Sequence, residues 1–401
     1  MSLRRQLLVT FGVQGAGAAA VLLATLWLGT GLGPEVQGGF SRTKSEIEFI
    51  AALAMFGLPQ ALFFHVKSGG LSARAALRWA LWSALLALLI GAVYGLLAYA
   101  RAGAWVLVAL GAAVAACVAH GQLRALLLVR QRTVWFNVLT ALPQVLVLAG
   151  VLGVIGRGTL GASFPSVWFV LFAFAYGVAA VLAWQRLSAV ADAPVHSQMG
   201  WLELVHYGVA AWLTAALSTA AILAAQRWVE GAEGRVALGQ FTMAMTLVQV
   251  PLTPISYAAP LLFRRWMEQP GARASQRWAG ALFALLLGAA ALVWVLASVW
   301  SDLGLGAAYH GATRALAVLL AGGAAEAASR VLTVQAGASG LPWIAVRAEA
   351  ARWGVLAIGW LAPLPHGLLP VCAVWATAAA AAALVVAWHA RARAALMRRA
   401  R

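Results

Sequence analysis

The sequence predicts an all-α polytopic membrane protein with about twelve transmembrane helices in two pseudo-repeated six-helix bundles. Three observations lead to this fold class. The chain is 63% hydrophobic and 10% charged, whereas soluble domains carry about 25% charged residues. Apolar runs of about 20 residues, each long enough to cross roughly 30 Å of hydrocarbon, recur along the whole length. A short motif near the start of the chain recurs at its midpoint.

Twelve apolar segments account for most of the chain. They are expected at residues 7–29, 47–66, 79–100, 105–128, 135–155, 167–185, 205–225, 236–262, 278–300, 313–335, 344–363 and 368–389. The eleventh is the weakest, because Arg347, Glu349 and Arg352 interrupt its start. The first is too long for the apolar core of a cleavable signal peptide and lacks a small-residue cleavage site after it, so it is expected to remain as a span.

A repeated motif relates the two halves. Residues 33–40 read GPEVQGGF and residues 234–241 read GRVALGQF, so that both have the pattern G-x4-G-x-F. The offset from Gly33 to Gly234 is 201 residues, half of the 401-residue chain, and it also places Pro59 on Pro260. Parallel halves of this kind are typical of transporters with a substrate path between two bundles.

The predicted bundles are an N-terminal one at 1–190 and a C-terminal one at 191–401. If both termini are cytoplasmic, 21 of the 28 Lys and Arg residues fall on the inner side and 7 on the outer side. This bias follows the positive-inside rule. The net charge of +17 is therefore mainly a topology signal, and nucleic-acid binding is not expected. Arginine and alanine dominate as in high-GC bacterial genes, so a multi-pass protein of the bacterial cytoplasmic membrane is expected.

The sequence offers no pattern for a cofactor. Cys117 and Cys372 both fall inside expected spans, where buried free thiols are the simplest interpretation. No metal-ligand or disulfide spacing exists, so neither a metal nor another cofactor is expected. All loops are short, which leaves no room for a soluble catalytic domain.

Glu326 and Arg330 in the tenth span are the clearest ionisable candidates, because charges inside spans are costly and by default functional. They lie four residues apart and can pair on one helix face. In one interpretation Arg330 binds an anionic headgroup in a cavity and Glu326 senses a proton or a cation. In the other they form a structural ion pair near the inner interface, with Arg330 snorkelling.

His120 and Arg124 in the fourth span form a second pair at this spacing. Arg124 is a candidate for contacting a phosphate at the cytoplasmic mouth of the path, or else an ordinary positive-inside anchor. His120 is a candidate coupling residue, or else a hydrogen-bonded packing residue.

Residues 41–46 are expected to lead from the first outer loop into the second span. Arg42 and Glu46 are spaced to pair, as are Lys44 and Glu48. The two cations depart from the positive-inside trend. They indicate either a basic rim that receives a pyrophosphate or acidic sugar on the outer side, or a solvated helix start with internal salt bridges.

Prolines are concentrated where bending would matter. They break backbone hydrogen bonds and kink helices, so they are candidate hinges for alternating access and equally candidate static kinks. The hinge candidates are Pro59, Pro251, Pro254 and Pro260.

Residues 32–40 (LGPEVQGGF) and 56–62 (FGLPQAL) together resemble the N-terminal signature of polysaccharide flippases, the Wzx-type O-antigen and exopolysaccharide transporters. Their superfamily, the multidrug/oligosaccharidyl-lipid/polysaccharide exporters, also contains MATE drug exporters and the lipid II flippase. The resemblance is specific over roughly the first 70 residues. It implies a MATE-like fold that moves undecaprenyl-pyrophosphate-linked oligosaccharide from the inner to the outer leaflet by alternating access.

The resemblance also implies site residues and partners. Arg42 and Lys44 match the place where such flippases put cations for the pyrophosphate, whereas the counterparts in the second half, Met243 and Met245, are uncharged. Expected partners are the lipid-linked oligosaccharide, membrane lipids, and a polysaccharide polymerase or other assembly proteins. Internal pseudo-symmetry suggests that a monomer suffices.

Two other functions stay open. A MATE-like cation-coupled antiporter of small molecules would require an acidic cavity. The deep carboxylate Glu326 is flanked by Arg330, which favours an anionic substrate instead. A polytopic enzyme acting on lipid-linked glycans would need grouped catalysts. No catalytic residue is predicted, because the outer acidic residues are scattered singly: Glu35, Glu230, Glu233 and Asp302.

Overall fold

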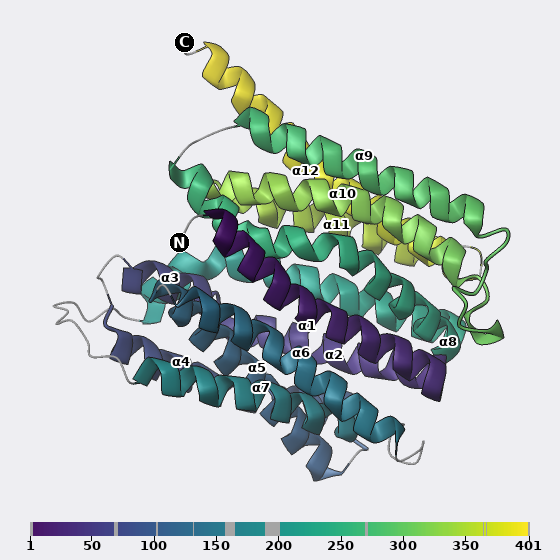
Figure 1. Ribbon diagram of the computed structural model, residues 1–401, viewed down its shortest axis with the longest axis horizontal. Coiled ribbons are helices and arrows are strands. Elements are labelled where there is room, and N and C mark those ends of the chain that lie inside the picture. Colours follow the sequence, from purple (N-terminus) through teal and green to yellow (C-terminus); the bar gives the residue numbers. More distant parts are fainter. Residues whose placement is uncertain are drawn as a thin grey trace. The chain divides into compact units, whose positions relative to one another are not determined.

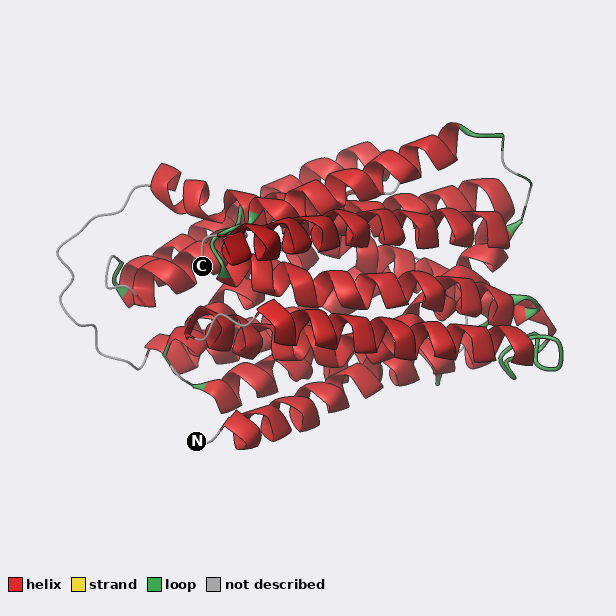
Figure 2. Cartoon of the chain, turned by 90° about the horizontal axis from the view of Figure 1, so that it is seen from above, coloured by secondary structure: helices red, strands yellow, loops and turns green. Residues whose placement is uncertain are grey.

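The computed structural model describes residues 3–67, 71–101, 103–130, 132–156, 165–188, 201–268, 272–363, 365 and 367–399. Within these ranges every regular element is a helix (Figure 2). The α-helices are α1 (Leu3–Leu32), α2 (Pro34–Met55), α3 (Leu58–Lys67), α4 (Ala73–Ala98), α5 (Ala104–Val129), α6 (Thr133–Ile155), α7 (Pro165–Ser188), α8 (Trp201–Glu268), α9 (Ala272–Leu296), α10 (Ala312–Ala338), α11 (Trp343–Leu361) and α12 (Leu368–Arg399). The all-α prediction is confirmed.

The helices are those of a multi-pass membrane protein. In the described part of the chain, nine are long and apolar enough to cross a membrane, or ten if the bent pair α2 and α3 is one span. Twelve spans were expected. The stretch Gly208–Ala259 of α8, which overlaps the expected spans 205–225 and 236–262, counts once here, although the non-helical backbone of Gly234 divides it into two helical parts. The charged α11 is not among the nine.

The repeated motif has the same backbone role in both halves. Gly33 separates α1 from α2 with φ +86°, and Gly234 kinks α8 with φ +83°. Side chains disfavour this left-handed region, so glycine is the residue that permits each break. The motif phenylalanines, Phe40 and Phe241, are both buried.

The second glycines of the two motifs pack against each other. A Cβ on Gly38 would lie 2.9 Å from the backbone nitrogen of Gly239, and a Cβ on Gly239 would overlap the Pro34 carbonyl oxygen. Neither backbone can move away easily, because each belongs to a helix. The two copies of the motif therefore form a close helix contact that requires glycine, as small residues do in membrane helix pairs.

We expect Gly38→Ala to destabilise the protein by about 1–3 kcal/mol, as overpacking of a filled core does. Gly39→Ala is the matched control, because its Cβ meets nothing within 4 Å and alanine favours a helix over glycine. Thermal unfolding of the two variants in detergent measures the difference. Equal stability would show that the two motifs do not touch.

The second expected span begins earlier and is more broken than 47–66. α2 starts at Pro34, and a break at Phe56 and Gly57, both with positive φ, turns the chain by 47° into α3. Pro59 is the second residue of α3, near the helix start, where proline is well tolerated. The Leu53 carbonyl, next to the break, accepts a hydrogen bond of 3.0 Å from the Trp212 indole.

The chain forms two compact units. Unit 1 comprises Met1–Trp27 and Gly39–Thr219. In it, α5 packs against α4, α6 and α7 (Figure 1). Leucines and alanines of α3 to α7 fill a core at one end, with Leu62 and Leu127 fully buried.

Unit 2 comprises Leu28–Gly38 and Ala220–Arg401. Its central helix is α10, which packs against α9 and α12, and α11 packs against α12 (Figure 1). Small residues of α10, such as Gly322 and Ala324, are buried there. A Cβ on Gly322 would lie 2.7 Å from the Ala376 Cα of α12, so these two helices also meet through small residues.

Candidate functional site

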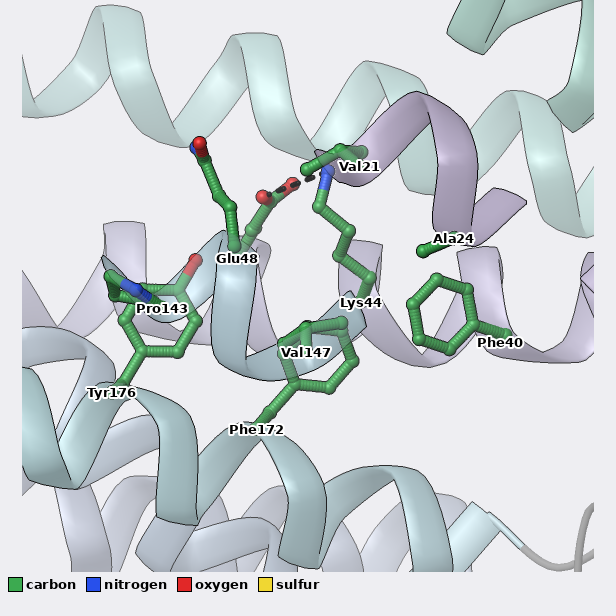
Figure 3. A pocket seen from close by; sticks show the side chains of 10 residues that line it. Val21, Ala24, Phe40, Lys44, Glu48, Pro143, Val147, Phe172 and Tyr176 are labelled. Carbon is green, nitrogen blue, oxygen red and sulfur yellow. Dashed lines mark ion pairs between the residues drawn. The ribbon is translucent and has the colours of Figure 1, made fainter. Parts of the chain in front are cut away.

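A pocket opens inside unit 1 between α1, α2, α6 and α7 (Figure 3). It occupies about 440 Å³, counting the space at its open mouth. Its lining residues come from near the middle of α2, α6 and α7: Phe40, Lys44, Glu48, Pro143, Gln144, Val147, Phe172 and Tyr176, with Val21 and Ala24 from α1.

Lys44 and Glu48 are the charged residues among these lining side chains. The Lys44 Nζ lies 3.3 Å from the Glu48 Oε1, and the two groups point toward one another in Figure 3. Their side chains stay 35% and 39% exposed, so both remain accessible from the pocket. The predicted pairing of these two residues is confirmed.

Residues 41–46 were expected to lead from a loop into a span, but they lie inside α2. α2 begins at Pro34, so at about 1.5 Å per residue Lys44 lies about 15 Å along the helix. The hydropathy of the sequence did not indicate that the helix starts at Pro34, because the first turns of α2 are polar.

Aromatic rings line the pocket beside this pair. The Phe40 and Phe172 rings stack at 5.5 Å between centroids, and Phe172 stacks on Tyr176 at 6.4 Å. The Gln144 Oε1 atom, from the same lining, is buried without a hydrogen-bond partner. Sequence reasoning missed the aromatic rings, since Phe40 of α2 lies far in the sequence from Phe172 and Tyr176 of α7.

Arg42 lies on the opposite side of α2 from Lys44, because two residues are about 200° apart around a helix. Its Nε is 3.7 Å from Glu46 Oε1, and the Tyr99 hydroxyl donates a 2.5 Å hydrogen bond to Glu46 Oε2. The predicted pairing of Arg42 with Glu46 is confirmed. Arg42 is not among the lining residues of the pocket, so the structure does not bring the two predicted cations together.

His120 and Arg124 lie on α5 and are not among the lining residues of the pocket. His120 is buried, with Nε2 2.7 Å from the Leu139 carbonyl oxygen, and its ring lies 5.4 Å from that of Tyr176. These are the contacts of a hydrogen-bonded packing residue. The Arg124 guanidinium lies 5.6 Å from the centre of the Phe136 ring.

A charged cluster lies within unit 2. The Arg330 Nε donates to Glu326 Oε1 at 3.0 Å, which confirms the predicted pair, and its Nη1 donates to the Ser256 hydroxyl at 2.7 Å. Arg352 of α11 donates to the other oxygen of Glu326 and lies 3.4 Å from Glu349. Two arginines and two glutamates therefore balance each other.

The arginines of this cluster differ in burial. The Arg352 side chain is 4% exposed and lies 5.7 Å from the Trp375 ring centre, whereas that of Arg330 is 31% exposed. Both oxygens of Glu326 are occupied by arginine. Sequence reasoning assigned no role to Arg352 or Glu349, because 26 residues separate Arg352 from Glu326 and only the packing of α11 brings them together.

The proline candidates differ in their surroundings. Pro251 and Pro254 lie in α8, where Gly234 has the non-helical backbone angles. The side chain of Pro260 lies outside the described part of the structure. At Pro59, by contrast, the chain bends directly before the proline.

The described residues contain no cluster of three or more His, Cys, Asp or Glu side chains that could hold a metal.

Similar folds occur among solved transporter structures. An inward-facing multidrug-resistance MATE family transporter of the MOP superfamily superposes with a TM-score of 0.71 at 16% identity, covering 98% of this chain and 99% of that one. A lipid II flippase in an inward closed conformation gives 0.72 at 10% identity, covering 96% and 87%. An outward-facing MATE family transporter gives 0.64 at 18% identity, covering 99% and 95%.

This chain has the MATE-like fold. The fold is therefore shared with both a drug transporter family and a lipid flippase, and the low identities extend the likeness no further. No protein-family model matches the sequence, and no curated protein matches it. The function rests on the chemistry of the pocket.

Proposed function

We propose that this protein is a flippase of polysaccharide biosynthesis in the bacterial cytoplasmic membrane. It moves undecaprenyl-pyrophosphate-linked oligosaccharide, such as an O-antigen or exopolysaccharide unit, from the inner to the outer leaflet by alternating access. The observation that carries this proposal is the accessible Lys44 near the middle of α2, inside a pocket.

A cation inside a membrane-spanning segment is costly and is usually retained for a function. An ammonium suits a phosphate, which it meets as a point charge. The aromatic wall of Phe40, Phe172 and Tyr176 offers apolar surface to the sugar next to that phosphate. The polyprenyl tail stays in lipid throughout.

The wider mechanism belongs to the same proposal. The bundles at 1–190 and 191–401 move against each other, both termini are cytoplasmic, and a monomer carries out transport. Arg330 provides a second contact for the anionic headgroup, because its side chain stays 31% exposed beside Ser256. A polysaccharide polymerase or another assembly protein receives the product.

The test is reconstitution into liposomes with a fluorescent undecaprenyl-pyrophosphate glycan. A membrane-impermeant quencher then follows how fast the headgroup changes leaflet. We expect movement faster than in protein-free liposomes. No acceleration with any of several glycans would contradict the proposal.

A cation-coupled small-molecule antiporter is the second candidate. The observation in its favour is Glu48, whose carboxylate shares the pocket with aromatic rings, a combination that suits organic cations. Efflux of a cationic dye driven by a pH gradient, together with no glycan movement, would favour this candidate. An enzymatic function has no support, because the charges of the pocket form an ion pair rather than a catalytic group.

A further inference from the structure

We propose that the pocket binds an anion and a proton together, with Lys44 holding the anion and Glu48 the proton. This inference rests on the proposed function, because it assumes an anionic headgroup. It assigns a coupling role to Glu48, in place of the coupling candidates Glu326 and His120.

The resting pocket is electrically balanced. Lys44 and Glu48 are one helical turn apart on α2 and 3.3 Å from each other, and they are the charged groups of the pocket lining. An anion that binds Lys44 competes directly with the carboxylate of Glu48. Displaced from Lys44, that carboxylate faces a second negative charge close by in the same pocket, which repels it.

The other helices around Glu48 supply no replacement cation among the described residues of the lining. α7 contributes the neutral phenol of Tyr176, α6 the amide of Gln144, and α1 only Val21 and Ala24. α5, which packs against α6 and α7, carries the buried thiol of Cys117, which is not in the lining. The cation of α5, Arg124, lies over the Phe136 ring and is not in the lining either.

A proton from water therefore offsets part of this charge. The pyrophosphate diester brings two negative charges; with one proton on the Glu48 carboxylate the pocket gains one net negative charge, and without that proton it would gain two. Because linkage is reciprocal, anion binding draws a proton in and a low pH tightens anion binding. Transport of the headgroup is then coupled to a proton through one side-chain pair, without a metal ion.

Glu326 and His120 are less suited to this task. Both oxygens of Glu326 accept from arginines, so its negative charge is already compensated twice. His120 is buried against Leu139 and Tyr176. Neither is among the residues that line the pocket.

The experiment is calorimetric titration of the detergent-purified protein with farnesyl-pyrophosphate-linked N-acetylglucosamine. This probe is a pyrophosphate diester, so its own charge stays constant near neutral pH. Titrations in two buffers of different ionisation enthalpy give the number of protons taken up. For the wild type we expect uptake approaching one proton per ligand and an affinity that falls up to tenfold per pH unit as pH rises.

Glu48→Gln should bind the probe at least as tightly as the wild type, without proton uptake and without pH dependence. Glu46→Gln is the matched control: this residue lies two positions away on the opposite face, with Arg42 and Tyr99, and should keep the wild-type pH dependence. Wild-type binding without proton uptake would overturn the inference whether or not the variants fold.

The outcomes separate the inference from the proposed function. Binding that is lost in Lys44→Gln but keeps its proton uptake in Glu48→Gln would reject the role of Glu48 and leave the flippase proposal intact. No binding of the probe by the wild type at any pH would reject both.

Discussion

Arg352→Ala is expected to destabilise the protein by roughly 3–5 kcal/mol, the usual effect of removing one member of a buried ion pair. Arg352 is nearly fully buried and compensates both Glu326 and Glu349. Without it, Glu326 keeps only Arg330, and Glu349 is left without a cation within the cluster. The loss should appear as a lower unfolding temperature in detergent and a reduced abundance in membranes.

Arg330→Ala is the matched control for this result. It removes the other partner of the same glutamate, but its side chain is 31% exposed, so water can replace part of its interaction. We expect a clearly smaller loss of stability, together with slower transport if Arg330 contacts the headgroup. A second comparison is Arg352→Ala combined with Glu349→Ala, which removes the stranded carboxylate and should recover part of the loss.

Equal unfolding temperatures of Arg352→Ala and Arg330→Ala would contradict this account of the cluster. They would mean that burial does not distinguish the two arginines. A normal unfolding temperature with lost transport in Arg352→Ala would instead move Arg352 from a stabilising role to a functional one.

Local spacing explains which parts of the site were predictable. Arg42 with Glu46, Lys44 with Glu48, and Glu326 with Arg330 all pair as expected. In each case four residues separate the partners, and helix geometry alone brings such side chains together. The repeat motif could be recognised for a similar reason: Gly33 and Gly234 both have positive φ, a local backbone conformation that favours glycine.

Packing explains what remained hidden. Arg352 and Glu349 interrupt an apolar segment in the sequence, and only the position of α11 shows that they complete a charge cluster. The start of α2 was missed because its first turns contain Glu35, Gln37 and Arg42. Buried polar residues lower the hydropathy of a segment even when the protein, not water, surrounds them. The same polar stretch delivers Lys44 to the pocket.

The second large effect is expected for Lys44→Gln, which should slow headgroup movement in liposomes by about 10–100-fold. A hydrogen bond to a charged group contributes about 1.5–3 kcal/mol, and each 1.36 kcal/mol corresponds to a factor of ten. The substitution keeps a polar side chain of similar reach but removes the charge. It also leaves Glu48 without its ion-pair partner, which adds repulsion against an incoming anion.

Two variants show whether charge in the pocket is what matters. Lys44→Arg restores a cation at the same place and should recover much of the rate. Arg42→Gln removes a cation from the opposite face of α2, where it pairs with Glu46. It should lower abundance more than the rate per molecule, since Arg42 is not among the pocket residues.

If Arg42→Gln slows movement as strongly as Lys44→Gln at equal abundance, the anion path runs along the other face of α2. If neither slows it, the headgroup does not use α2, and Arg330 of unit 2 becomes the residue to test next.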